Sequence, residues 1–264
     1  MINKNSSDKI ISDLTSKYGF LLNLRNENNT QNFQHDLFRV RIANKHEHIN
    51  GQEQLSYPKS NVSSGRCNFE NDPIFYCSDK STTAIAETLK YKNPIDNYLY
   101  LSVWRLKFGM NINIFPFLDR AKQEGLLVDI DVLGVISDEE KRNIAKKQLL
   151  EIEEYFYDID HSKSASICHI LFNRKNFPCD CIMYPSFIAA ETGINVSIKT
   201  DFVDKYLMFQ RAYKFELFGE KGDYKMNLLS STISKGEFVW EIPSSNQIPL
   251  NTLVKDLDYN KSYY

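Results

Sequence analysis

The chain has 264 residues, 42% of them hydrophobic and 25% charged, with a formal net charge of -2 at pH 7. It is long enough to bury a sizeable core, and its charge gives no general case for binding nucleic acid. No apolar run approaches the roughly 20 residues that a membrane-spanning helix needs, and Met1 to Lys9 lacks the apolar segment of a secretory signal. Five cysteines, an odd number, argue against a disulfide framework. A cytoplasmic protein is therefore expected.

The first 35 residues predict an N-terminal extension. It holds a short helix from Asp8 to Tyr18 and an Asn-rich connector of low intrinsic order. The main domain is expected over residues 36–218. Residues 219–264 predict a C-terminal extension, with a short strand over Gly236–Ile242 and a polar tail.

A strand is predicted from Leu37 to Ile42, where apolar residues alternate with Arg39 and Arg41. Alternate side chains of a strand point to opposite faces, so the two arginines share one face. On this pattern alone, a solvent-exposed face with two solvated arginines is favoured.

The segment from Gly65 to Glu87 is the most informative part of the chain. Gly65 permits a close backbone approach, and Arg66 carries a planar fork of donors suited to phosphate or carboxylate. A buried strand is predicted over Pro73–Cys77, and a helix over Thr82–Tyr91, capped by Asp79 or Ser81. The small and apolar neighbours of Glu87 on that helix favour a partly enclosed carboxylate over a solvated one.

Further elements follow in order. They are a strand over Tyr98–Lys107, a helix opened by a capping box at Ser137–Glu140 and running to Tyr157, a helix over Ser164–Phe172, a strand over Cys179–Tyr184 and a strand within Lys205–Phe218. Ser186 stands just after the Cys179–Tyr184 strand, at the kind of strand end where functional residues gather.

A zinc site is the alternative interpretation of Cys179 and Cys181, with Cys168 and His169 upstream. The apolar run that continues from Cys181 instead indicates a core strand, in which free cysteines behave as small hydrophobes. We favour the core strand and expect no metal.

Four motifs in this order resemble the RES domain family: F-R-V-R at Phe38–Arg41, G-R-x-N at Gly65–Asn68, F-Y-x-S with T-A-x-A-E ending at Glu87, and Y-P-S with G-x-N ending at Asn195. The family is known as the toxin half of bacterial toxin–antitoxin pairs, and characterised members destroy NAD. The resemblance implies an α+β fold like that of ADP-ribosyltransferases, with a split, mixed and mostly antiparallel sheet around a nucleotide cleft and flanking helices.

Residue by residue, the resemblance implies a catalytic group of Glu87, Arg39 and Ser186, and NAD-binding positions at Arg66, Tyr76, Asn195 and Gly65. Cleavage of the nicotinamide–ribose bond passes through an oxocarbenium-like state, which a carboxylate such as Glu87 stabilises. The arginines would hold the pyrophosphate, and Ser186 and Tyr76 would contact the nicotinamide or the ribose. This chain departs from many members at Cys67, where an aromatic residue is usual. Its insertions between Arg41 and Gly65 and over Phe115–Asp160 are also longer.

The resemblance implies an NAD glycohydrolase or phosphorylase acting as a toxin or defence effector, with NAD as substrate and no cofactor. Two alternatives stay open: an ADP-ribosyltransferase that modifies a macromolecule, and a catalytically silent binding module. The partners expected are inorganic phosphate for phosphorolysis, a helix-turn-helix antitoxin and a second copy of the chain, with no membrane and no directly bound nucleic acid.

Overall fold

A computed structural model describes residues 4–24, 30–31, 35–91, 97–118, 131–186, 193–220, 223–234 and 238–242. The elements run in the order α1 (Lys4–Leu22), β1 (Thr30–Gln31), β2 (Leu37–Asn44), η2 (Gln52–Leu55), β3 (Ile74–Ser78), α2 (Ser81–Tyr91), β4 (Asn97–Leu106), β5 (Ile112–Pro116), α3 (Glu139–Tyr155), α4 (Ser162–Asn173), β6 (Cys181–Pro185), β7 (Ile194–Lys199), α5 (Thr200–Tyr206), β8 (Leu207–Glu220) and β9 (Asp223–Ile233).

The strands form one open sheet in the order β1-β5-β6-β7-β3-β2-β4-β8-β9. Only β5 and β6 pair in parallel, and the other neighbours are antiparallel. The mixed, mostly antiparallel α+β architecture expected from the sequence is thus confirmed.

The sheet is split between β2 and β3. These strands share a single paired position, Phe38 with Ser78, whereas β2 pairs with β4 along its whole length. Two well-formed half-sheets therefore meet at one point and diverge beyond it. The site described below lies at this opening.

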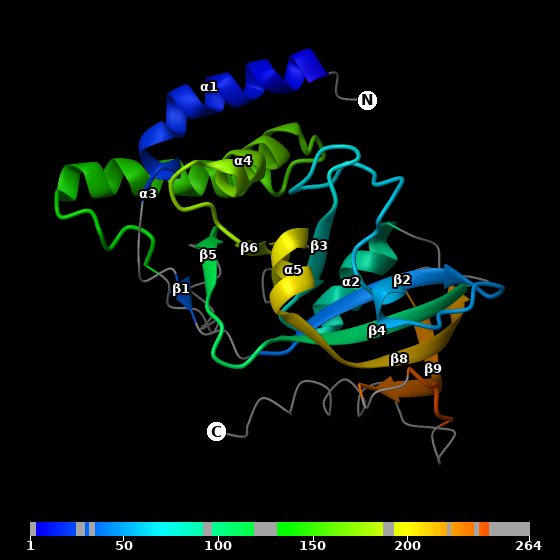
Figure 1. Cartoon of the computed structure of the whole chain (residues 1–264). Helices are drawn as coiled ribbons and strands as arrows, with labels where there is room; N and C mark the ends of the chain where they lie inside the picture. Colours follow the sequence, from blue (N-terminus) through cyan, green and yellow to red (C-terminus); the bar gives the residue numbers. More distant parts are fainter. Residues whose placement is uncertain are drawn as a thin grey trace.

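The helices cover the two half-sheets unequally. Figure 1 shows α1, α3 and α4 together at one end of the molecule, with α2 against the half-sheet that contains β2 and β4. A large apolar cluster joins the helices α1, α3 and α4 to the sheet, and it includes Tyr18, Phe115 and Phe156. A smaller cluster packs Ala84 and Ile85 of α2 against Phe38 and the inner residues of β4 and β8.

The boundaries of α2, α3 and α4 lie within two residues of the expected ones, whereas α5 was not predicted. The boundaries of α1 differ by four residues at each end. This helix extends from Lys4 to Leu22 rather than from Asp8 to Tyr18. Its apolar side is fully buried at Tyr18 and Leu21, and the Tyr18 hydroxyl lies 2.7 Å from that of Tyr155. The Asn-rich connector that follows α1 lies largely outside the described residues.

At the start of α3 the capping residue is Asp138, whose carboxylate accepts a hydrogen bond from Lys141 N–H at 3.0 Å. The capping box expected to start at Ser137 is therefore wrong by one residue. An Asp side chain satisfies a free N–H of the first turn as well as a serine does, so the same short polar run starts the helix one residue later.

The C-terminal region departs from expectation in two ways. An eleven-residue strand, β9, pairs with β8 and was not predicted. Alternation of Tyr224, Met226 and Leu228 was the signal for it. The strand expected over Gly236–Ile242 is, in its described part, only a bridge between Glu241 and Ser231. Aromatic packing of Phe238 on Phe209 holds this segment instead. The division at residues 35 and 218 stays a prediction.

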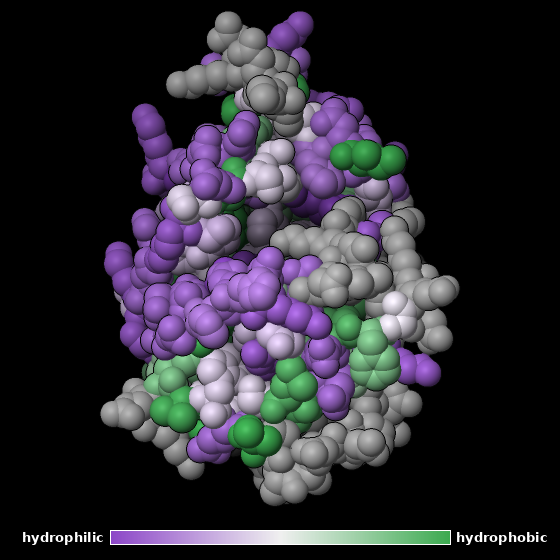
Figure 2. All heavy atoms as spheres, turned by 90° about the vertical axis from the view of Figure 1, so that its right-hand side faces the viewer, coloured by the Kyte–Doolittle hydropathy of each residue, from purple (hydrophilic) through white to green (hydrophobic). Residues whose placement is uncertain are grey.

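The surface seen in Figure 2 is mostly hydrophilic, with hydrophobic side chains gathered toward one end. No helix in the described part of the chain combines the length and the apolar character that a membrane span requires.

Candidate active site

A cleft of about 360 Å³ opens where β2 and β3 diverge. Six of the seven predicted site residues line it: Arg39, Gly65, Arg66, Tyr76, Glu87 and Asn195. Ser186, the seventh, is fully buried and does not line the cleft. Its hydroxyl donates a hydrogen bond to Glu87, which does. Residues separated by more than 150 positions in the sequence thus meet at one place.

The Glu87 carboxylate is fixed by two donors on one oxygen. The Ser186 hydroxyl and the Asn195 side-chain amide each donate to Oε1 at 2.7 Å. Its other oxygen, Oε2, makes no hydrogen bond within the described part of the chain, so it is the oxygen left for a ligand. Charge-assisted hydrogen bonds of this kind set the orientation of a carboxylate strongly.

The two donors are themselves held in place. The Ser78 hydroxyl donates to Asn195 Oδ1 at 3.1 Å, which orders the amide so that its nitrogen faces Glu87. Ser186 N–H donates to the carbonyl of Gly193 at 2.8 Å. Gly193 has no room for a side chain, because a Cβ there would lie 2.1 Å from Thr83 Oγ1 of α2. The glycine therefore lets β7 approach the helix that carries Glu87.

Arg39 bridges the split in the sheet. Its Nη1 donates to the carbonyl of Tyr76 in β3 at 2.7 Å, and its Nε donates to the carbonyl of Ser56 at 3.1 Å. Its guanidinium also lies over the Phe75 ring, 5.4 Å from the centroid. Burial lowers the pKa of Arg39 to about 10, so the group is still a cation at neutral pH. Its remaining N–H groups are available to an anion in the cleft.

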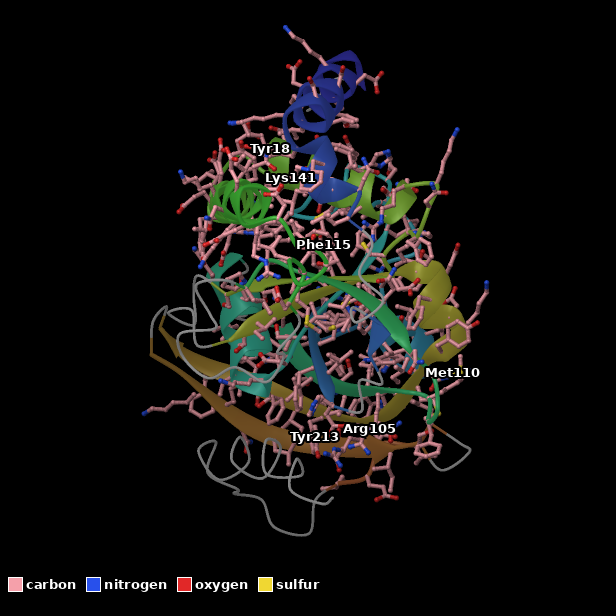
Figure 3. The ribbon with its side chains drawn as sticks, turned by 90° about the vertical axis from the view of Figure 1, so that its left-hand side faces the viewer. Tyr18, Arg105, Met110, Phe115, Lys141 and Tyr213 are labelled. Carbon is pink, nitrogen blue, oxygen red and sulfur yellow. The ribbon has the colours of Figure 1, made fainter. Side chains whose placement is uncertain are left out.

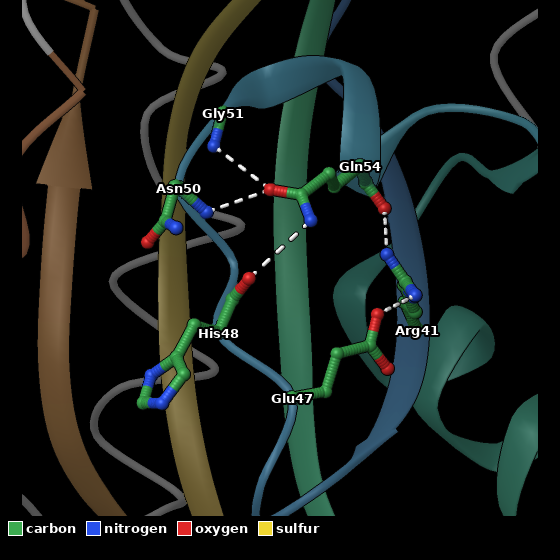
Figure 4. Close-up of polar contacts among 6 residues, drawn as sticks. All are labelled: Arg41, Glu47, His48, Asn50, Gly51 and Gln54. Carbon is green, nitrogen blue, oxygen red and sulfur yellow. Dashed lines mark hydrogen bonds and ion pairs between the residues drawn. The ribbon is translucent and has the colours of Figure 1, made fainter.

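The segment that follows β2 packs against Arg39. Arg41 anchors the same segment to β2 (Figure 4). Arg41 donates to the carbonyl of Gln54 and pairs with Glu47. Gln54 Oε1 in turn accepts from the N–H groups of Asn50 and Gly51, at 2.7 and 3.2 Å. The exposed strand face that alternation favoured is therefore wrong: both arginines are half-buried and bind backbone carbonyls.

The loop that carries Arg66 is shaped by Tyr76. The Tyr76 hydroxyl donates to Asn68 Oδ1 at 2.6 Å and accepts from Cys67 N–H at 2.8 Å. A Cβ on Gly65 would come within 2.9 Å of this hydroxyl, which explains the glycine. Arg66 Nε donates to the carbonyl of Phe156, at the end of α3, at 2.7 Å. Tyr76 thus supports the loop through its hydroxyl while its side chain lines the cleft.

A scan against protein families matches the RES domain over residues 36–206. This match covers more than half of the chain and includes all seven site residues. The chain belongs to the RES domain family. RES domains are generally linked to toxin–antitoxin systems and to NAD-related activity. A search of the curated proteins finds no match.

The cleft of this RES domain is also lined by residues that were not among the predicted site residues, and two of them, Tyr184 and His161, carry polar rings. Burial raises the pKa of Tyr184 well above its ordinary value, so its phenol stays neutral, and its ring stacks on Phe156 with centroids 4.7 Å apart. Tyr184 precedes Ser186 in the Y-P-S motif, which was the signal for it. His161 had no such signal, because it belongs to none of the four motifs.

Cys179 and Cys181 are buried in the core of the RES domain, as expected. Burial raises the pKa of both thiols well above the ordinary value, which disfavours the thiolate form that zinc needs. No cluster of three or more potential metal ligands occurs among the residues that the structure describes.

Proposed function

We propose that this RES domain binds NAD in the cleft and cleaves the bond between nicotinamide and ribose, with water or inorganic phosphate as the acceptor. The observation that carries the proposal is the Glu87 carboxylate, held at Oε1 by Ser186 and Asn195 in a cleft that also contains two arginines. NAD offers a matching pair of features: a sugar that becomes positively charged during cleavage and a pyrophosphate that is negatively charged throughout.

The reaction requires little beyond this arrangement. The C–N bond breaks with its electron pair going to the pyridinium nitrogen, so nicotinamide leaves neutral and needs no acid. Positive charge develops on the ribose, where a fixed carboxylate is worth most because it is already oriented and partly shielded from water. A water molecule that attacks the ribose carbon then loses a proton, which gives ADP-ribose. Attack by phosphate gives ADP-ribose 1″-phosphate instead.

The arginines hold the substrate in position and take no direct part in breaking the bond. Arg39 and Arg66 are each anchored by one or more backbone carbonyls, so their guanidinium groups present fixed donors to a pyrophosphate. Fixing the phosphates also fixes the ribose relative to Glu87, and correct orientation of this kind is a large part of enzymatic rate enhancement. Because the carboxylate and the arginines all face one cleft, a catalytic role is favoured over a silent binding module.

In this proposal the protein is a cytoplasmic toxin or defence effector that depletes NAD, and a helix-turn-helix antitoxin restrains it. The family association with toxin–antitoxin systems supports this role. An antitoxin that covers the cleft opening would stop the reaction without altering the fold.

The test is incubation of the purified full chain with NAD, with and without phosphate, followed by mass spectrometry. Free nicotinamide with ADP-ribose is expected for hydrolysis, and ADP-ribose 1″-phosphate, formed only with phosphate, for phosphorolysis. Intact NAD in both samples would contradict the proposal. If NAD then lost nicotinamide only when a macromolecular extract was added, with ADP-ribose attached to a component of it, the protein would be an ADP-ribosyltransferase.

A further inference from the structure

His161 lines the cleft, and it lies on a connection whose backbone is fixed by hydrogen bonds on both sides of this residue. The connection joins α3 to α4, and it is held at one end by the Arg66 contact with the carbonyl of Phe156. Asp158 Oδ1 accepts from Asp160 N–H at 3.1 Å, and Asp160 Oδ1 accepts from Ser162 N–H at 2.9 Å. These contacts fix the main chain on the approach to His161.

The backbone after His161 is fixed as well. Its carbonyl accepts from Ala165 N–H at 2.9 Å and from the Ser164 hydroxyl at 3.1 Å, so the residue caps α4 through its main chain. Its side chain makes no cap hydrogen bond, and the ring has no hydrogen-bond partner in the described part of the chain. The imidazole is thus a polar group that lines the cleft, on a rigid support, with its ring nitrogens available.

We propose that the imidazole of His161 acts beside Arg66 as a binding residue for a phosphate of the substrate, and that it takes up a proton when this phosphate enters the cleft. The inference rests on the proposed function, because it assumes an anionic nucleotide in this cleft. An imidazolium and a guanidinium together suit a pyrophosphate, which offers acceptor oxygens on two adjacent phosphorus atoms.

The charges around His161 favour this coupling. Burial, and then the positive charge of Arg66, lower the pKa of His161 in the free protein, while Asp160 and Asp158 oppose the shift. A bound phosphate neutralises Arg66 and adds negative charge, so it raises the pKa of the same imidazole. The other titratable groups that line the cleft are Arg39, Tyr76, Cys77, Glu87 and Tyr184.

The sign of the pH dependence follows from these shifts. His161 binds a proton more tightly in the complex than in the free protein, so ligand affinity increases as pH falls from the pKa of the complex to that of the free protein. Outside this window the contribution of His161 to the affinity is constant. Each unit by which binding raises the pKa corresponds to about a tenfold gain in affinity at low pH.

The experiment uses ADP-ribose, which keeps the pyrophosphate but lacks the bond to be cleaved. Calorimetric titration of the full chain between about pH 5 and pH 8, in buffers of different ionisation enthalpy, gives both the affinity and the number of protons taken up. Uptake of up to one proton is expected in the wild type. His161→Gln should abolish it, and His46→Gln, at an exposed position outside the cleft, should leave it intact.

A second measurement avoids the variant altogether. The pKa of His161 in the wild-type protein is followed by NMR without and with ADP-ribose, and an upward shift on binding is expected. Binding without any shift, or proton uptake that persists in His161→Gln, would overturn the inference while NAD cleavage still stood. A wild type that neither binds ADP-ribose nor cleaves NAD would overturn the proposed function, and this inference with it.

Discussion

Glu87 is the residue on which the proposed chemistry depends. One of its carboxylate oxygens is held by hydrogen bonds, and the other is available to the substrate. Ser186 and Asn195 both donate to Oε1, so neither is needed at Oε2. Ser186 is fully buried, and its hydroxyl reaches Glu87 rather than the open cleft. We therefore regard Ser186 as a positioning residue, in contrast to the direct contact with nicotinamide or ribose that the family resemblance implied.

Glu87→Gln should lower turnover of NAD at least about a hundredfold while leaving the affinity for NAD largely intact. Glutamine keeps an acceptor for Ser186 and Asn195 but removes the negative charge that stabilises the ribose cation. Single-turnover kinetics and a binding titration measure the two effects separately. Glu70→Gln, at an exposed position outside the cleft, is the matched control. Turnover close to that of the wild type would remove Glu87 from the mechanism.

Ser186→Ala should reduce kcat roughly tenfold to a hundredfold, the range expected for one lost hydrogen bond to a charged group. KM should change little, because Ser186 does not line the cleft. Ser166→Ala removes another buried hydroxyl, one that donates to the carbonyl of Ser162 in α4, and serves as control. Equal losses of activity in the two variants would indicate a general effect of removing a buried serine hydroxyl.

Among the elements, the segment between β2 and Tyr57 has the most direct influence on the site. Arg41 fixes Gln54, and two residues later the carbonyl of Ser56 accepts from Arg39. A contact outside the cleft therefore determines where a guanidinium inside it lies. The segment between Arg41 and Gly65 thus has a structural role at the site.

Arg41→Ala should raise the KM for NAD about fivefold to tenfold with kcat nearly unchanged, because it loosens the support of Arg39 by the equivalent of roughly one net hydrogen bond. Arg41→Lys should restore part of the loss, since lysine still reaches a carbonyl or Glu47. The control is Lys45→Ala, which removes an exposed ion pair with Glu216 and a cation–π contact with Tyr98, both outside the cleft. An unchanged KM in Arg41→Ala would show that this segment does not position Arg39.

Many of the elements could be predicted from local patterns, but β5, β7, α5 and β9 could not. The meeting of the site residues at one cleft was implied by the resemblance to the RES domain family. Burial of Arg39 and Arg41 could not, because it depends on how a polar segment of low periodicity folds back over β2. The direction of the Ser186 hydroxyl depends equally on tertiary packing. His161 lies on the connection between α3 and α4. The course of this connection cannot be predicted from local sequence patterns, so no pattern indicated that His161 would lie near Arg66.

At the scale of the whole molecule, the N-terminal helix belongs to the same apolar cluster as the strands that carry the site. Figure 3 shows Tyr18 and Lys141 in the helical layer, with Phe115 of β5 beneath it. The aromatic series continues from Phe115 through Phe117 and Phe156 to Tyr184, with ring centroids 4.7 to 5.1 Å apart. The helical layer and the cleft are thus joined by continuous packing.

Tyr18→Ala should destabilise the protein by about 3 to 5 kcal/mol, as is typical of truncating a large buried aromatic side chain. Phe20→Ala, on the same helix but at a side chain that is 50% exposed, should change stability by less than about 0.5 kcal/mol. Urea denaturation of both variants measures the difference. Equal stabilities would mean that α1 is a dispensable extension.

The central claim is that Glu87 faces the ribose whose bond to nicotinamide is broken, and the most direct test is a crystal structure of Glu87→Gln with NAD. We expect the nicotinamide ribose within hydrogen-bond distance of the side chain at position 87, and the pyrophosphate on Arg39 and Arg66, with His161 beside it. NAD bound away from position 87, or bound in the cleft with its adenine end toward that residue, would contradict the account.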